Sequence, residues 1–131
     1  MELLDLFTEN GAKWDAYKKW PMLFGVGGPD DTGVFEENYD ANHHIGLCHR
    51  RLSIIDLSSN GHQPMMDKEQ RIVVVVFNGE IYNFRAIRKE LQNKGCSFIS
   101  DSDTEVLIHA YKVWGIDFVH KLNGMFSIAL L

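Results

Sequence analysis

The feature that most constrains this chain is an apolar run that leads directly into a polar corner. Residues 73–83 read Val-Val-Val-Val-Phe-Asn-Gly-Glu-Ile-Tyr-Asn. Four consecutive β-branched residues followed by a phenylalanine predict a strand that is covered on both faces. Asn78-Gly79 predicts a turn with positive φ, and Glu80 places a carboxylate at its mouth. A rigid sheet is therefore expected to hold polar groups at its end, a position suited to chemistry.

The bulk composition indicates one globular domain and excludes several classes of partner. With 131 residues, 45% of them hydrophobic, the chain is expected to bury roughly two thirds of its unfolded surface. The 13 basic and 18 acidic residues give a net charge of -5, and the basic residues are scattered. This argues against nucleic acid and anionic membranes as partners. The sequence has no apolar run of the roughly 18 residues that a membrane span needs, and its first residues are acidic, so the expected location is cytoplasmic.

The candidate metal, disulfide and phosphate motifs have simpler interpretations. Cys48 and Cys96 lie in apolar surroundings without paired spacing, which indicates small reduced core residues. Adjacent side chains such as His43 and His44 would point to opposite faces of a strand, and no other Cys or His stands at ligand spacing, so no metal site is expected. The glycine-rich loop at residues 25–33 contains carboxylates that would repel a phosphate, which argues against nucleotide binding there.

Turn signals and apolar periodicity predict a mostly β first half followed by helices. Residues 1–24 are expected to form a helical leader of unclear role, and residues 25–131 are expected to form the domain that follows it. Strands are predicted near residues 33–36, 45–48, 52–56, 71–77, 96–99 and 125–131, with a polar turn at 58–67. Two amphipathic helices are predicted from an apolar face, an N-cap and a glycine stop. In the first helix the apolar face contains Phe84, Ile87 and Leu91, the N-cap is Asn83, and the stop is Gly95. In the second helix Ser102 and Glu105 form a capping box, and Gly115 is the stop. Its apolar face contains Val106, Leu107, Ala110, Tyr111 and Trp114. A third helix is expected over residues 116–122.

Arg51 is the residue whose role is most open from chemistry alone. It follows His49 and Arg50 on an apolar strand, so that one arginine can face inward, where it needs an anion. An ordinary salt bridge to Glu80 or Asp103 and a ligand carboxylate are equally good partners. Asp103 also has a simple interpretation as a helix-start residue. Together with the Asn78-Gly79-Glu80 corner, these groups would suit a zwitterionic amino acid.

Five motifs, in order, resemble the glutamine-hydrolysing domain of asparagine synthetases, a class II glutamine amidotransferase. They are His49-Arg-Arg-Leu-Ser-Ile-Ile-Asp-Leu-Ser58, Gly61-His-Gln-Pro-Met65, Phe77-Asn-Gly-Glu-Ile-Tyr-Asn83, Ser102-Asp-Thr-Glu105 and Leu122-Asn-Gly-Met-Phe126. The likeness runs from about Gly28 to the end.

The resemblance implies a fold, a reaction and a set of site residues. The fold is α+β, an N-terminal-nucleophile αββα sandwich of antiparallel sheets, truncated here. The reaction is attack of a cysteine on the glutamine carboxamide, which releases ammonia for a synthetase domain. By position, Arg51 would bind the α-carboxylate of L-glutamine, and Glu80 and Asp103 its α-ammonium group. Asn78 and the Gly79 N–H would form the oxyanion hole, and the pocket wall would include Leu52, Ile54 and Ile55.

The sequence departs from the family at its start. The family nucleophile is an N-terminal cysteine with a free α-amino group as its base, whereas this chain begins Met1-Glu2. Neither Cys48 nor Cys96 matches the nucleophile by position. No cofactor is expected in this chain, since ATP and Mg would belong to the synthetase domain. The strands that would follow residue 131 in the family are also expected to be missing.

Three hypotheses follow from these matches and departures. The first is a catalytically silent remnant that still binds glutamine. The second is a fragment of an active enzyme whose start and end are mis-assigned. The third is an interaction module that pairs through residues 125–131 with a synthetase domain or with a second copy of the chain.

Overall fold

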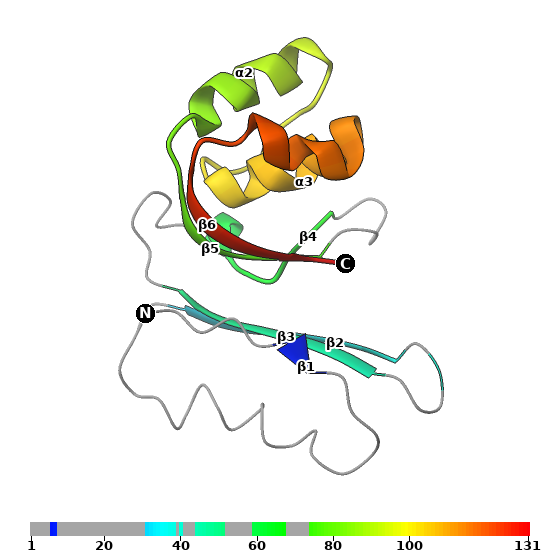
Figure 1. Ribbon diagram of the computed structural model, residues 1–131. Helices are drawn as coiled ribbons and strands as arrows, with labels where there is room; N and C mark the ends of the chain where they lie inside the picture. The colour runs from blue at the N-terminus through cyan, green and yellow to red at the C-terminus, as the bar shows by residue number, and fades with distance from the viewer. Residues whose placement is uncertain (1–5, 8–30, 39, 41–43, 52–58, 68–73) are drawn as a thin grey trace.

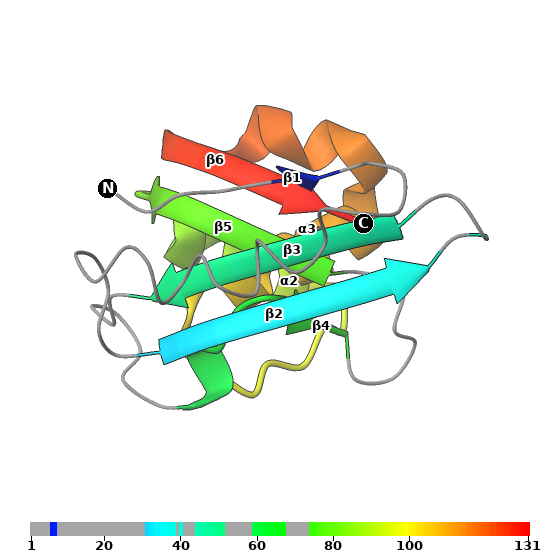
Figure 2. The ribbon, with the colours of Figure 1, turned by 90° about the horizontal axis from the view of Figure 1, so that it is seen from below.

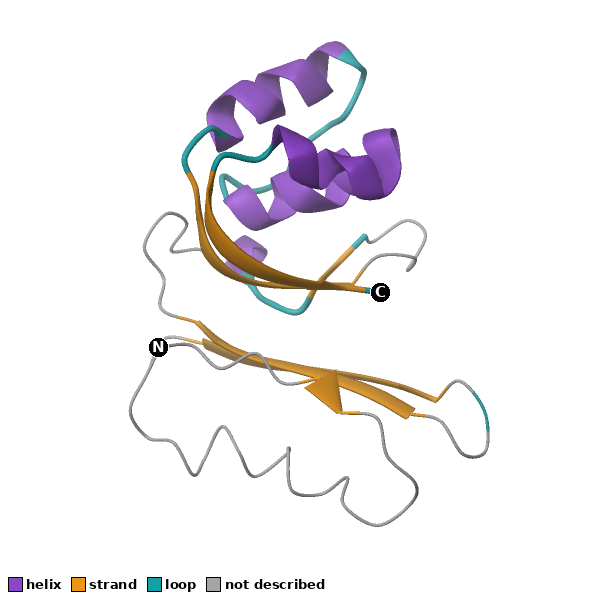
Figure 3. Cartoon of the chain, viewed as in Figure 1, coloured by secondary structure: helices purple, strands orange, loops and turns teal. Residues whose placement is uncertain are grey.

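The computed structural model of the chain describes residues 6–7, 31–38, 40, 44–51, 59–67 and 74–131. Two three-stranded antiparallel sheets lie face to face, and the helices cover the outer face of one of them (Figures 1 and 3). The described part therefore has three layers: helices, a central sheet and a second sheet. None of the described helices is long and apolar enough to cross a membrane.

The second sheet contains β1 (Leu6–Phe7), β2 (Asp31–Asn38) and β3 (His44–Arg51) in the order β1-β3-β2. The strands predicted near 33–36 and 45–48 are confirmed and are longer than predicted. The helical prediction for residues 1–24 is wrong at Leu6–Phe7, where the backbone pairs with Leu47 and Gly46 of β3. That long-range pairing overrides the local helical spacing. The other leader residues, and the strand predicted at 52–56, lie outside the described ranges.

The central sheet contains β4 (Met65–Met66), β5 (Val74–Ile81) and β6 (Gly124–Leu130) in the order β4-β5-β6. The strands predicted at 71–77 and 125–131 are therefore confirmed where the structure describes them. β4 and the 3-10 turn η1 (Ser59–Gly61) lie within the segment predicted as a polar turn.

The turn predicted at Asn78-Gly79 is wrong, because β5 continues through it to Ile81. Gly79 does have a positive φ of 140°, as predicted, but it lies inside the strand, opposite Phe126 of β6. A Cβ atom at Gly79 would come within 2.1 Å of the Met125 carbonyl oxygen. The glycine therefore allows close approach of β6, and the pairing with β6 holds the Asn-Gly-Glu segment in a sheet.

β5 packs on both faces, as the run of valines predicts. Val75 and Phe77, 0% and 4% exposed, belong to the core beneath the helices. Val76, also 0% exposed, packs with Leu47 of β3 in the core between the two sheets. The view from below shows the second sheet lying across the central one (Figure 2). β5 is therefore the strand that joins the two cores.

The predicted helices are present, with differences at their ends. They are α2 (Phe84–Asn93), α3 (Asp103–Trp114) and the 3-10 helix η2 (Gly115–Lys121), where a third helix is predicted. Asn83 precedes α2, but its side chain makes no capping bond and instead bonds Lys121 and Asn123. Its amide therefore ties the start of α2 to the segment that leads into β6.

α3 has half of the predicted capping box. Ser102 accepts a hydrogen bond from Thr104 N–H, as an N-cap should. The Glu105 carboxylate instead accepts from the N–H groups of Ile99 and Ser100. These bonds hold residues 96–99 as a loop, so the strand predicted there is wrong.

Candidate functional site

Arg51 is the last residue of β3 and is buried on the side of the sheet that faces β5. Leu47, His49 and Arg51 alternate along the strand and therefore share one face, and Leu47 contacts Val76 from that face. A Cβ atom on Gly61 would lie 2.1 Å from Arg51 Nη2. The guanidinium group therefore packs directly on the backbone of Gly61, and Arg51 is the one of the two adjacent arginines that faces inward.

His49 lies two residues before Arg51 and is 3% exposed. Burial, together with the positive charge of Arg51, lowers the pKa of His49 to about 4, although a hydrogen bond with the backbone of Phe77 works in the opposite direction. The imidazole is therefore neutral at pH 7. The neutral ring of His49 therefore lies between strand β5 and the end of β3 that carries Arg51.

Residues 59–64, called here the crossing loop, connect the two sheets and the start of α3. His62 Nδ1 lies 2.6 Å from Asp31 Oδ2 of β2. Gln63 Oε1 accepts from Phe77 N–H of β5 at 2.6 Å, and its Nε2 donates to Thr104 Oγ1 of α3 at 3.1 Å. The loop therefore contacts every layer of the described fold.

Asn78, Gly79 and Glu80 lie at the far end of β5 from the buried valines. Because side chains alternate along a strand, Asn78 and Glu80 point to the same side as Val76, which is the side of the second sheet. Asn78 is half-buried and Glu80 is exposed. The polar end of β5 therefore opens to solvent beyond the core that the two sheets share.

Asp103 is the first residue of α3 and is 6% exposed. Burial raises the pKa of Asp103, and the charge of Glu80 raises it further, while the backbone amide groups of Asp103, Ile81 and Thr104 work in the opposite direction. The structure therefore brings Glu80 and Asp103 close enough to interact. Among the described residues, none donates a hydrogen bond to Asp103 Oδ2, which is fully buried.

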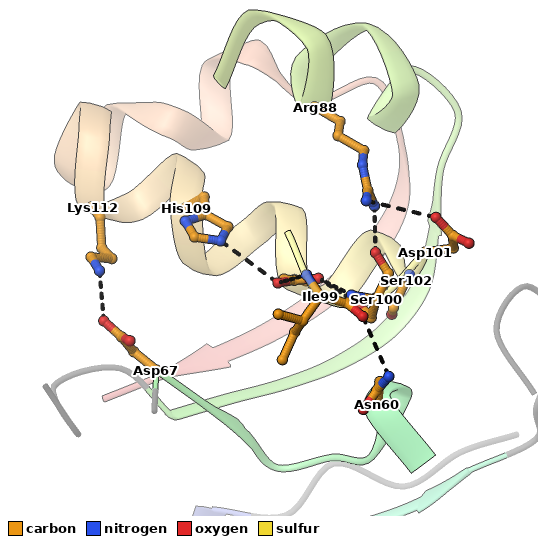
Figure 4. A network of polar contacts seen from close by, with 10 residues as sticks. Asn60, Asp67, Arg88, Ile99, Ser100, Asp101, Ser102, His109 and Lys112 are labelled. Atoms are coloured by element: carbon orange, nitrogen blue, oxygen red, sulfur yellow. Dashed lines mark hydrogen bonds and ion pairs between the residues drawn. The ribbon is translucent and has the colours of Figure 1, made fainter. Parts of the chain in front are cut away.

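A network of polar contacts fixes the segment before Asp103 (Figure 4). Arg88 of α2 donates to the Ser100 carbonyl at 2.7 Å and lies over the ring of Phe98. Asn60 of the crossing loop donates to the Ile99 carbonyl at 3.3 Å. Glu105 completes the network from α3 with the bonds described above. The start of α3 is thus held by α2, by the crossing loop and by its own carboxylate.

Neither cysteine lies with these groups. Cys48 stands between Leu47 and His49 on β3, so its side chain points to the face opposite the one that carries Arg51. Cys96 packs against the core beneath the helices. Neither forms a disulfide bond with another described residue. Within the described ranges, moreover, no group of three or more His, Cys, Asp or Glu side chains is placed to hold a metal ion.

We expect Asp103→Asn to raise the free energy of unfolding at pH 7. The folded state raises the pKa of this carboxyl, so its ionised form costs stability at pH 7, and the neutral amide removes that cost. As the pH falls through the raised pKa, the wild-type carboxyl takes up a proton and the difference should close. Urea unfolding at pH 7 and in mildly acid buffer measures both effects. Asp101→Asn, at a side chain that is 93% exposed, is the control and should change little.

The structure places the predicted site residues as follows. Arg51 ends β3, Asn78, Gly79 and Glu80 lie in β5, and Asp103 begins α3, whereas Leu52, Ile54 and Ile55 lie outside the described residues. Glu80 lies within electrostatic range of Asp103. Convergence of all these groups on one ligand stays a prediction.

Sequence reasoning missed the roles of His49, Gln63 and Thr104. All three occur within the recognised motifs, but nothing in the pattern shows what their side chains contact.

Comparison with known proteins gives a consistent family. The family described as "Glutamine amidotransferase domain" matches residues 13–131, beginning inside the segment expected to be a separate leader. Asparagine synthetase (glutamine-hydrolyzing) 1 of Bacillus subtilis (strain 168) is 44% identical over 103 residues, 79% of this chain and 15% of that protein. Asparagine synthetase (glutamine-hydrolyzing) 1 of Arabidopsis thaliana is 44% identical over 106 residues, 79% of this chain and 16% of that protein. The chain thus spans about 15% of the length of these curated relatives.

Among solved structures, the fold is similar to that of glutamine phosphoribosylpyrophosphate amidotransferase from B. subtilis complexed with ADP and GMP. The TM-score is 0.75 at 18% identity, over 100% of this chain and 35% of that one. This confirms the α+β sandwich of N-terminal-nucleophile type. Together with the family match over most of its length, it shows that the chain belongs to the glutamine amidotransferase domain family.

Proposed function

We propose that this chain binds L-glutamine between Arg51 and the pair formed by Glu80 and Asp103, and that the 131 residues bind it without hydrolysing it. The observation that carries the proposal is the buried Asp103 Oδ2, which has no donor among the described residues, close to the second carboxylate of Glu80. A buried acceptor without a partner is costly, and a ligand ammonium group would satisfy it. These two carboxylates are therefore suited to bind a cationic amine.

The other two ends of glutamine have matching groups in this proposal. Arg51 would offer a forked donor for the α-carboxylate, and its guanidinium group packs against Gly61. Asn78 offers an amide donor next to Gly79, where a carboxamide oxygen would lie. The lack of hydrolysis rests on the two thiols, since Cys48 faces away from Arg51 and Cys96 lies beneath the helices.

We further propose that the domain works with a synthetase domain, as the names of its relatives suggest, in the cytoplasm. Such a domain would use the ammonia that glutamine hydrolysis releases, and ATP and Mg would belong to it. In that setting the present residues would select glutamine and orient its carboxamide. In this proposal the thiol nucleophile at the Asn78 end of β5 would be neither Cys48 nor Cys96.

Calorimetric titration with L-glutamine tests the proposal. We expect saturable binding by the wild-type chain and a Kd about 30-fold higher for Arg51→Ala, because a charge-assisted fork is lost. Arg51→Lys is the matched control that keeps the charge but loses the fork, and it should recover part of the affinity. Asp103→Asn should weaken binding even though it stabilises the free protein.

Three results would contradict the proposal. Equal affinity of wild type and Arg51→Ala would remove Arg51 from the site, and absence of any binding heat or ligand-induced spectral change would remove the site itself. Release of ammonia from glutamine that depends on Cys48 or Cys96 would overturn the claim that the chain does not hydrolyse its ligand.

A further inference from the structure

We infer that Gln63 is a positioning residue, which sets the distance between the Asn78-Gly79 segment and the start of α3. The inference rests on the proposed glutamine site, and it assigns to the crossing loop a role that the ligand-binding residues do not have. Gln63 touches no ligand in this scheme. It acts through the two residues that it bonds.

The contacts of Gln63 are buried at both ends. Its carboxamide oxygen accepts from Phe77 N–H at 2.6 Å, and its carboxamide nitrogen donates to Thr104 Oγ1 at 3.1 Å. Gln63, Phe77 and Thr104 are 6%, 4% and 2% exposed. Phe77 directly precedes Asn78, and Thr104 directly follows Asp103. The Gln63 side chain therefore links Phe77 to Thr104. Phe77 is next to Asn78, the proposed oxyanion donor, and Thr104 is next to Asp103, which is proposed to accept from the ammonium group.

Gln63 also takes the place of a strand partner at this edge of the central sheet. β4 pairs with β5 only at Val74 and Val75 in the described residues. Two residues further along, Phe77 N–H meets the Gln63 side chain instead of a backbone carbonyl. Because the site lies beyond that point, the end of β5 that carries Asn78 depends on Gln63 for its hydrogen bond on this side.

The backbone of the same loop faces the Arg51 side. A Cβ atom on Gly33 would lie 1.9 Å from the Gln63 carbonyl oxygen, and Gly61 packs on the Arg51 guanidinium. The loop has almost no room to shift against β2 and β3. A movement of Gln63 would therefore change the placement of Asn78 and Asp103 relative to Arg51.

The test compares variants of both partners by calorimetric titration with L-glutamine. Gln63→Met keeps the length of the side chain and removes both bonds, and we expect its Kd to rise about tenfold. Thr104→Val keeps the shape and removes the hydroxyl, and its Kd should rise about threefold. Thr104→Ser keeps the hydroxyl and should bind within about twofold of wild type. A purely structural role would instead rank the variants by stability.

Two further measurements separate positioning from loss of stability. Ile87→Val shortens a buried side chain beneath α2, so it should lower the melting temperature and leave Kd unchanged. In the free protein, the amide proton of Phe77 should move upfield in Gln63→Met, because its short hydrogen bond is lost, but should stay in place in Thr104→Val.

The outcomes are distinct. A Gln63→Met variant that binds as well as wild type overturns the inference while leaving the proposed function intact. Equal affinity losses in Thr104→Val and Thr104→Ser also overturn it, and this pair decides the question if Gln63→Met does not fold. A wild-type chain that does not bind glutamine contradicts the proposed function, and the inference then fails with it.

Discussion

Replacing Gly79 by alanine is expected to lower the free energy of unfolding by about 4 kcal/mol, the sum of two costs. The first is backbone strain, because φ at this residue is 140°. The second is a steric clash, because the new Cβ atom would lie 2.1 Å from the Met125 carbonyl oxygen and 2.6 Å from Phe126 Cα. Both groups belong to the backbone of β6, which cannot move without breaking the pairing with β5.

Two other glycines separate these costs. Gly95 has a φ of 92° but nothing within 4 Å of its Cβ position, so Gly95→Ala should cost about 1 kcal/mol from strain alone. Gly124 has no positive φ, and a Cβ atom there would lie 2.1 Å from the Glu80 carbonyl oxygen. The loss of unfolding free energy in Gly124→Ala therefore measures the cost of a steric clash without backbone strain. Urea unfolding of the three variants measures the differences. A Gly79→Ala variant no less stable than Gly95→Ala would show that β6 does not constrain β5 as described.

Glu105→Ala is expected to cost about 3 kcal/mol of unfolding free energy, because a buried carboxylate that accepts three hydrogen bonds is lost. Its oxygens accept from Ile99 N–H at 2.9 Å, from Ser100 N–H at 2.7 Å and from Ser100 Oγ at 2.6 Å. Glu105 and Ser100 are 6% and 5% exposed, so water does not readily replace the carboxylate. The loop before α3 should loosen, and Asp103 with it.

Glu105→Gln is the matched control, since its carbonyl oxygen still accepts from one or two of these donors, and it should lose about half as much stability. Hydrogen exchange at the Ile99 and Ser100 amides should rise in Glu105→Ala before the protein unfolds globally. Unchanged exchange there would mean that Arg88 and Asn60 hold the loop without Glu105.

Local pattern predicted the elements whose burial follows a simple period. The valine run predicts a strand buried on both faces, and Ile87 with Leu91 predicts the buried face of α2, because each pattern depends on neighbours along the chain. Asn78-Gly79 predicts a hairpin turn from local preference, but pairing with β6, more than 40 residues later, keeps the segment extended. The local sequence preference carries no information about this partner strand.

The residues of the candidate site also differ in whether the sequence can predict them. Glu80 and Asp103 are identifiable from motif position, and the charge of Glu80 acts on Asp103 in the structure. Gln63 is not, since its partners lie 14 and 41 residues away and no spacing rule connects them. Glu105 is predicted as a capping-box residue from its spacing to Ser102, yet its carboxylate serves the preceding loop, which the sequence pattern assigns to a strand.

The two sides of the candidate site belong to different layers. Arg51 is part of the second sheet, whereas Glu80 and Asp103 belong to the central sheet and to the helix above it. The layers meet through the core that contains Leu47 and Val76 and through the crossing loop. A ligand held at both ends therefore acts as a removable cross-link between layers. If glutamine binds as we propose, the filled site would restrain sliding of the second sheet against the central one.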